Sequence, residues 1–231
     1  MTTSTWPRPA ARQLASGLSF LLAPVLLGAQ AMPNQLPLTA AAPDSFLVSM
    51  ETTRGRVVIQ AHRAWSPLGV DRFYHLTRSG FYDGGVIYRV GPTASYPGGF
   101  VVQFGLSNDS SVNRAWNGAG IPDEPVRVPH RRGTVMFARG GPNTRTIELA
   151  IDLSANTGLD TVLYQGVRGF PPIGLVVEGM AALDSLNRRY GNAPLAHEDS
   201  IAAGGWRYLD RVFPGLDRIQ RVRVAKEWRG R

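Results

Sequence analysis

Hydrophobic and polar residues alternate along the chain from residue 46 onward, in the pattern of β-strands. Phe46, Val48 and Met50 are separated by smaller or polar residues, and the alternation resumes at Val57 and Ile59 after a short turn. Successive side chains of a strand point to opposite faces of a sheet, so this pattern gives each strand one apolar face. The sequence therefore predicts a β-hairpin at the start of the folded region.

Apolar residues also recur at helical spacing in a few stretches. Ser66 and Pro67 are typical of a helix N-cap and first helical position, and a helix is predicted over residues 66–79. A second helix is predicted over residues 178–190, and a short third helix over residues 206–213. The 26 glycines and 17 prolines indicate many turns, which suits an all-β domain better than a helical bundle.

Short apolar stretches separated by glycines and other turn residues occupy the middle of the chain. Five of them predict brief strands: Val86–Val90, Phe100–Phe104, Thr134–Ala138, Ile147–Ile151 and Ile173–Val177. Residues 219–224 alternate arginines with valines and predict a closing strand. Many short strands of this kind favour a β-barrel or a β-sandwich.

The N-terminal segment has the three parts of a secretory signal peptide. Arg8 and Arg12 precede an apolar run over residues 14–27, and the segment ends in small residues up to Ala31. The alternative is a retained membrane anchor, but the run is shorter than the roughly 20 residues that span a bilayer, and Pro24 interrupts it. We expect cleavage after Ala31 and export of the mature chain to the periplasm or the medium.

Composition narrows the chemistry that the mature chain can perform. The 231 residues include no cysteine, which excludes disulfides, thiolate metal sites, iron–sulfur clusters and a cysteine nucleophile. The formal charge is +8, with Lys226 as the only lysine. The arginines are dispersed without interleaved aromatic residues, so no nucleic-acid partner is predicted.

Motifs for hydrolysis or for metal binding are missing. The four histidines are scattered at positions 62, 75, 130 and 197, and each is predicted to be a surface or loop residue rather than a metal ligand. Asp123 and Glu124 follow a proline, which indicates a turn rather than an acid/base pair. The sequence therefore predicts neither a metal nor a cofactor.

An ordered series of motifs does stand out between residues 46 and 224. Its members are Val70-Asp71-Arg72-Phe73, Gly80-Phe81-Tyr82-Asp83-Gly84, Val86-Ile87-Tyr88-Arg89-Val90, Phe100-Val101-Val102-Gln103, Gly120-Ile121-Pro122-Asp123-Glu124, Gly133–Arg139, Gly141-Pro142-Asn143-Thr144 and Ile173–Met180. In this order the series resembles the cyclophilin-type peptidyl-prolyl cis–trans isomerases. The resemblance implies an all-β fold, a closed eight-stranded antiparallel β-barrel capped by two α-helices. It places this domain at residues 45–226, between a flexible lead-in at residues 32–44 and a tail at residues 227–231.

The resemblance also implies a reaction and three catalytic residues. The bond before proline resists rotation by about 18–20 kcal/mol, because its C–N bond has partial double-bond character. Arg89 aligns with the family's catalytic arginine, Phe100 with its pocket phenylalanine and Gln103 with its active-site glutamine. Such a site is expected to aim a guanidinium at the prolyl region, hold the ring in an apolar socket and position the flanking carbonyls.

Five further positions align with substrate-binding positions of the family. Val101 replaces a gatekeeping methionine, and Arg139 takes a position whose backbone holds the peptide. Glu148 stands at a polar contact, Ala150 replaces an aromatic wall of the proline socket, and Phe170 replaces a histidine. The socket is thus expected to be reshaped, because an alanine buries less apolar area than an aromatic ring.

Two loops depart from the family's pattern. Residues 91–99 form a longer loop beside Arg89 than the family has. The pocket leucine and tryptophan align with residues 164–166, or the leucine position is taken by Leu159 if the loop after it is longer.

We therefore expect an exported, monomeric isomerase, without a membrane anchor after cleavage, acting on proline-containing segments of other exported proteins. Uncatalysed isomerisation takes tens to hundreds of seconds and can limit folding, which gives such an enzyme its purpose. One alternative is a catalytically weak chaperone or proline-peptide-binding module with the same fold. Another is an arginine-rich surface that binds an anionic envelope polymer.

Overall fold

The computed structural model describes residues 40–93 and 98–230 of the chain. The predicted signal peptide over residues 1–31 and most of the predicted lead-in lie outside these described residues. Within the two described ranges, no helix is long and apolar enough to cross a membrane.

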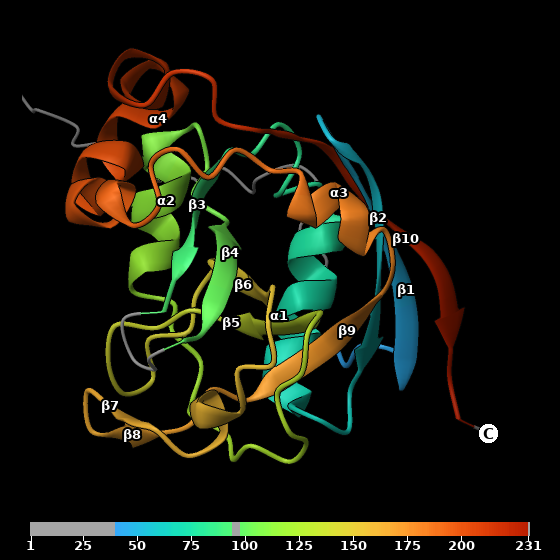
Figure 1. The fold of residues 1–231 in the computed structure, drawn as a ribbon. Coiled ribbons are helices and arrows are strands. Elements are labelled where there is room, and N and C mark those ends of the chain that lie inside the picture. The colour runs from blue at the N-terminus through green and yellow to red at the C-terminus, as the bar shows by residue number, and fades with distance from the viewer. Residues whose placement is uncertain (1–39, 94–97, 231) are drawn as a thin grey trace, which may run out of the picture. The chain divides into compact units, whose positions relative to one another are not determined.

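Eight strands build one antiparallel sheet that curls around the core (Figure 1). They are β1 (Ser45–Thr52), β2 (Gly55–His62), β3 (Ile87–Pro92), β4 (Phe100–Phe104), β5 (Thr134–Phe137), β6 (Leu149–Asp152), β9 (Pro172–Glu178) and β10 (Ile219–Trp228). Their order across the sheet is β10-β1-β2-β9-β5-β6-β4-β3. Two short strands, β7 (Leu163–Tyr164) and β8 (Val167–Arg168), form a separate hairpin. The predicted β-hairpin at the start of the fold is confirmed as β1 and β2.

The prediction of a closed barrel is wrong, because the sheet keeps two edges, β3 and β10. The chain joins these two edges at an isolated antiparallel bridge between Val86 and Arg218, the residues just before β3 and β10. Beyond that bridge β10 continues along β1, while Asn192 packs closely over Gly91 of β3. The sheet is therefore a curled half-barrel, and β10 continues to Trp228, past the residue where we expected the domain to end.

The concave side of the sheet encloses the main hydrophobic core. Alternate residues of β1, such as Phe46 and Val48, are fully buried there, as the alternation in the sequence predicts. The ring of Phe73 stacks on that of Phe46 at a centroid distance of 6.0 Å. Residues that are far apart in sequence therefore share one apolar interior.

The first predicted helix is confirmed as α1 (Pro67–Arg78), with Ser66 as N-cap residue and Pro67 in its first turn. Its buried face carries Val70 and Phe73, and α1 packs against β9 and β10. Glu124 accepts hydrogen bonds from the Leu68 and Gly69 amides, at 2.9 and 3.1 Å, and so holds the start of the helix. Glu124 thus has a structural role, as expected for a residue outside an acid/base pair.

The second predicted helix is much shorter than expected. Only α3 (Met180–Asp184) is helical, and it packs against β2. The Asn187 amide donates to Asp217 Oδ2 at 2.6 Å instead of to a carbonyl of the preceding turn, which ends the helical path. That α1 and α3 cap the ends of the sheet stays a prediction.

The C-terminal helix is longer than predicted and has a partner helix that the sequence analysis missed. α4 (Glu198–Val212) follows a 3₁₀ turn, η2 (Ala193–His197), and bends at Gly205, where φ is 54°. The missed helix is α2 (Ser110–Asn117), whose N-terminus is capped by a preceding aspartate. Figure 1 shows α2 and α4 together on the side of β3 and β4.

Candidate active site

A cavity of about 380 Å³ lies over four neighbouring strands, β3, β4, β6 and β5. Strand pairing places Arg89 opposite Gln103, Gln103 opposite Ala150, and Ala150 opposite Met136. These four residues form one row across the sheet, and all of them line the cavity. The register of the sheet therefore joins motifs that lie up to 61 positions apart, from Arg89 to Ala150.

Arg89 is the basic group at one end of this row, and only 9% of it is exposed. Its Nε donates to Asn192 Oδ1 at 2.8 Å, its Nη1 to Gln103 Oε1 at 2.8 Å, and its Nη2 to the Pro92 carbonyl at 2.7 Å. Burial lowers the pKa of the Arg89 guanidinium from its ordinary value. Bonds from all three nitrogens fix the plane of the guanidinium against the cavity.

Gln103 connects Arg89 to a buried carboxyl group. Its Oε1 accepts from Arg89, and its Nε2 donates to Glu148 Oε2 at 2.8 Å. The hydroxyl of Tyr88 donates to the same Glu148 oxygen. Burial raises the pKa of Glu148 and raises that of Tyr88 well above its ordinary range. Gln103 therefore has both ends of its amide engaged, and it orients Arg89.

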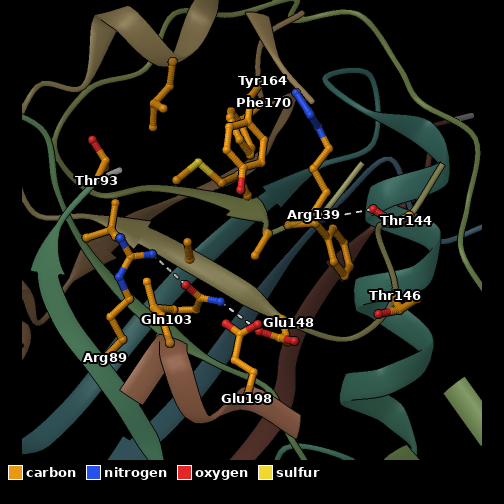
Figure 2. A pocket seen from close by; sticks show the side chains of 18 residues that line it. Arg89, Thr93, Gln103, Arg139, Thr144, Thr146, Glu148, Tyr164, Phe170 and Glu198 are labelled. Atoms are coloured by element: carbon orange, nitrogen blue, oxygen red, sulfur yellow. Dashed lines mark hydrogen bonds between the residues drawn. The ribbon is translucent and has the colours of Figure 1, made fainter. Parts of the chain in front are cut away.

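A second carboxyl group, Glu198 at the start of α4, faces the cavity beside Glu148 (Figure 2). Burial, together with the charge of Glu148, raises the pKa of Glu198 to about 7, although Arg89 acts in the opposite direction. Arg89, Gln103, Glu148 and Glu198 are called the polar side of the cavity below. Near neutral pH this side therefore places the fixed positive charge of Arg89 beside a Glu198 carboxyl group that gains and loses its proton in this range.

The apolar side of the cavity is a small cluster that is distinct from the main core. Its members are buried hydrophobic residues: Val101, Met136, Ala150, Leu159 and Phe170. Tyr164 packs against this cluster, with its ring centroid 5.7 Å from that of Phe170. Figure 2 shows these two rings together, across the cavity from Gln103. They supply aromatic surface near the position where Ala150 offers only a methyl group.

The sequence left two candidates for the family's pocket leucine, Leu159 and residues 164–166, and both stretches contribute a residue to the cavity. Leu159 belongs to a short 3₁₀ turn, η1 (Thr157–Asp160), and Tyr164 belongs to the hairpin of β7 and β8 that follows. Since Leu159 and Tyr164 both line the cavity, the assignment of the family's leucine position to Leu159 stays a prediction.

Arg139 has a side-chain role that the sequence did not indicate. Its guanidinium lies 4.2 Å from the centre of the Phe170 ring, and its Nη2 donates to the Val167 and Gly169 carbonyls at 3.1 and 2.5 Å. Burial lowers the pKa of Arg139. Arg139 therefore holds the hairpin and Phe170 against the sheet, whether or not its backbone contacts a peptide.

Phe100 does not lie where we expected it. It is not among the residues that line the cavity, and its ring packs against the main core, 5.3 Å from the Arg188 guanidinium. The cause is the alternation along β4, which directs Val101 and Gln103 to the cavity and their neighbours to the opposite face. The other seven predicted site residues do line the cavity.

His130 lies in a loop, as predicted, but its side chain is fully buried rather than at the surface. Its Nδ1 lies 2.7 Å from Asp152 Oδ2, and its Nε2 lies 2.6 Å from the Phe170 carbonyl oxygen. Burial opposes a charge on His130, but the hydrogen bond and charge of Asp152 outweigh it and raise the pKa of the imidazole. His130 thus anchors the backbone of Phe170 from behind the apolar side.

Several cavity residues were not predicted to belong to the site, among them Met136, Leu195 and Glu198. Asn192, which binds Arg89 without lining the cavity, was missed as well. Met136 lies inside a motif that was recognised, so its neighbours could have indicated it. Asn192 and Glu198 carry no sequence signal, because only the path of the chain after α3 brings them to β3. Within the described ranges, no group of histidine and acidic residues could hold a metal ion.

Known proteins resemble this chain in sequence and in fold. The family model for cyclophilin type peptidyl-prolyl cis-trans isomerases matches residues 47–203. Peptidyl-prolyl cis-trans isomerase A of Dickeya dadantii is 29% identical over 151 residues, covering 64% of this chain and 74% of the relative. Peptidyl-prolyl cis-trans isomerase cyp18 of Streptomyces antibioticus is 28% identical over 155 residues, covering 66% of this chain and 89% of the relative.

A solved structure shares the fold. The cyclophilin type peptidyl-prolyl cis-trans isomerase of Cryptosporidium parvum superposes with a TM-score of 0.53 and 16% sequence identity. The match covers 78% of this chain and 98% of that one. Since the family model spans more than half of the sequence, the chain belongs to the cyclophilin-type peptidyl-prolyl cis–trans isomerases.

Proposed function

We propose that the cavity over β3, β4, β6 and β5 is where this enzyme rotates X–Pro bonds, with Arg89 as the catalytic residue. The observation that carries this assignment is the buried guanidinium of Arg89, held by three acceptors at 2.7–2.8 Å beside an apolar cluster. Rotation removes the amide conjugation, and the prolyl nitrogen then gains a lone pair. A fixed cationic donor stabilises that twisted state more than either planar one.

The two sides of the cavity would divide the work of binding and rotation. The apolar side, with the Tyr164 and Phe170 rings beside it, offers a surface for the pyrrolidine ring. Gln103 acts as a positioning residue, since both ends of its amide are engaged by Arg89 and Glu148. Val101 and Arg139 shape the cavity from β4 and from the turn after β5, and Phe100 supports β4 from the core.

The clients that we propose are proline-containing segments of other exported proteins, met by a monomer in the periplasm or the medium. Support comes from the N-terminal pattern of Arg8, Arg12, the apolar run and Ala31. N-terminal sequencing of the protein from producing cells tests this step. A mature N-terminus at Met32 in the exported fraction is expected, and an intact Met1 terminus confined to the cytosol would refute export.

A protease-coupled prolyl-peptide assay tests the catalytic assignment. Arg89→Ala is expected to lower kcat/KM about 100-fold, as removal of one preorganised transition-state donor does. Arg207→Ala is the matched control, because Arg207 is an exposed residue of α4. A wild-type rate equal to the spontaneous rate would refute the enzyme and favour the chaperone alternative, which refolding yields of proline-rich clients would then measure.

A further inference from the structure

The chain after α3 passes unusually close to β3 at the position of Gly91. A Cβ atom at residue 91 would lie 2.8 Å from Asn192 Oδ1 and 3.0 Å from the carbonyl carbon of Gly191. A Cβ atom there would force the Asn192 side chain or the Gly191 backbone to shift, so the crossing in its present form depends on the glycine in β3. Gly91 stands two residues after Arg89 in the same strand.

The close crossing brings the Asn192 side chain to Arg89. Asn192 Oδ1 accepts from Arg89 Nε at 2.8 Å, while Gln103 and the Pro92 carbonyl accept from the two terminal nitrogens. Pro92 and Gln103 belong to β3 and β4, which are part of the sheet itself. Asn192 is the only one of the three acceptors that comes from outside the sheet.

A guanidinium held only at its two terminal nitrogens can still tilt about the line that joins them. The bond at Nε fixes the third point of the plane, because Nε lies off that line. Hydrogen bonds of a charged donor are also roughly twice as strong as neutral ones, so this third bond restrains the side chain well.

We propose that Asn192 is a positioning residue for Arg89 and that Gly91 is the position in β3 that lets it reach there. The inference rests on the proposed catalytic role of Arg89. Asn192 continues directly into η2 and α4, which carry Leu195 and Glu198 into the cavity. The contact of Asn192 with Gly91 therefore orients the Arg89 guanidinium and also positions η2 and α4, which form one wall of the cavity.

The first test compares Asn192→Ala with Asn192→Asp in the prolyl-peptide assay. Loss of one charged hydrogen bond predicts a kcat lower by about tenfold in Asn192→Ala, with KM changed less than about twofold. Asn192→Asp keeps an oxygen acceptor and is expected to retain kcat within about threefold of wild type. Asn117→Ala, at an exposed position at the end of α2, is the matched control.

A second readout does not depend on activity. The ¹⁵Nε–¹Hε resonance of Arg89, assigned by its loss in Arg89→Lys, is expected to exchange slowly with water in the wild type. In Asn192→Ala it should exchange faster and shift, while the resonance is preserved in Asn192→Asp. An unchanged resonance in Asn192→Ala would overturn the proposal even if the wild-type protein proved inactive, which separates its failure from that of the proposed function.

A double-mutant cycle tests the part assigned to Gly91. Gly91→Ala leaves Asn192 intact but is expected to displace it, lowering kcat by about tenfold, as Asn192→Ala does. If both changes act through one contact, the kcat of the double variant should be no lower than that of the more severe single variant. Independent, multiplicative losses would overturn the link to Gly91, and a wild-type rate in Asn192→Ala would overturn the whole proposal.

Discussion

The two sides of the cavity are held in place by different kinds of contact. On the polar side, Arg89 and Gln103 are paired residues of adjacent strands, and each makes hydrogen bonds at 2.7–2.8 Å. On the apolar side, Phe170 belongs to a loop that Arg139 and His130 fasten to the sheet by single side chains. The sheet therefore holds the Arg89 guanidinium, whose direction matters, while the loop supplies the Phe170 ring, for which only the shape of the surface matters.

This difference predicts that damage to the polar side changes rate and damage to the apolar side changes affinity. A directional donor acts on the twisted state, whereas a hydrophobic surface binds planar and twisted prolines about equally. The predictions that follow test this division in order of the expected size of the effect.

After Arg89→Ala, Gln103→Leu should produce the largest change in rate. It removes one acceptor from Arg89 and one donor from Glu148, so kcat is expected to fall about 50-fold with KM nearly unchanged. Steady-state kinetics with one peptide measures both parameters. A rise in KM as large as the fall in kcat would contradict the division between the two sides.

Phe170→Ala should give the complementary result. Truncation of a buried aromatic residue costs about 3 kcal/mol of unfolding free energy and removes apolar surface from the cavity. KM is expected to rise about tenfold, while kcat at saturation stays within about threefold of wild type. Denaturant unfolding and steady-state kinetics on the same preparation measure both effects, and an unchanged KM would show that the ring does not contact substrate.

Glu198 predicts a dependence on pH near neutrality, because its pKa is raised to about 7. As the pH rises through this value, the new carboxylate charge offsets the field of Arg89, so kcat/KM should be about threefold higher at pH 6 than at pH 8. Glu198→Gln should retain the higher value across this range. A pH profile that is identical in the variant and the wild type would exclude Glu198 as its source.

The same group makes a prediction about stability with a definite sign. A carboxyl group whose pKa is higher in the folded than in the unfolded chain stabilises the fold most below its unfolded pKa. That contribution is lost as the pH rises from about 4.5 to about 7, the two values for Glu198. The free energy of unfolding of the wild type should therefore decline over this range relative to Glu198→Gln, and parallel curves would contradict the shift.

The smallest effect is expected at the exposed end of the hairpin beside the apolar side. Leu163 is 67% exposed, so Leu163→Ala should change the unfolding free energy by less than about 0.5 kcal/mol. Activity should stay within about twofold of wild type. A larger loss of affinity would show that the binding surface extends beyond Tyr164 and Phe170.

Local patterns were enough to predict the elements that are defined by neighbouring residues. Alternation around Phe46 and Val57 predicted β1 and β2, and the Ser66-Pro67 start predicted α1 within one residue at each end. Elements that depend on distant contacts were missed. The path after α3 is set by Asn187 and Asp217, 30 positions apart, which no helical spacing reveals.

The site shows the same limit. The motifs located Arg89, Gln103 and Ala150 individually, but only the pairing of β3, β4 and β6 makes them a row. Alternation along β4 shows that Phe100 and Gln103 face opposite sides, yet it does not say which side is the cavity. The burial of His130 could not be predicted, because its partner Asp152 is 22 positions away and carries no motif of its own.

The pairing of β1 with β10 also determines when the molecule can fold. Ser45 pairs with Trp228 and Thr52 with Ile219, so β1 cannot complete its pairing until β10 has been synthesised. Contacts of such long sequence separation slow folding, because the chain loses the entropy of closing a long loop before the strand pairing stabilises it. During synthesis β1 therefore has only β2 beside it, and the complete sheet forms only after the last strand has left the ribosome. This enzyme is itself a late-folding chain.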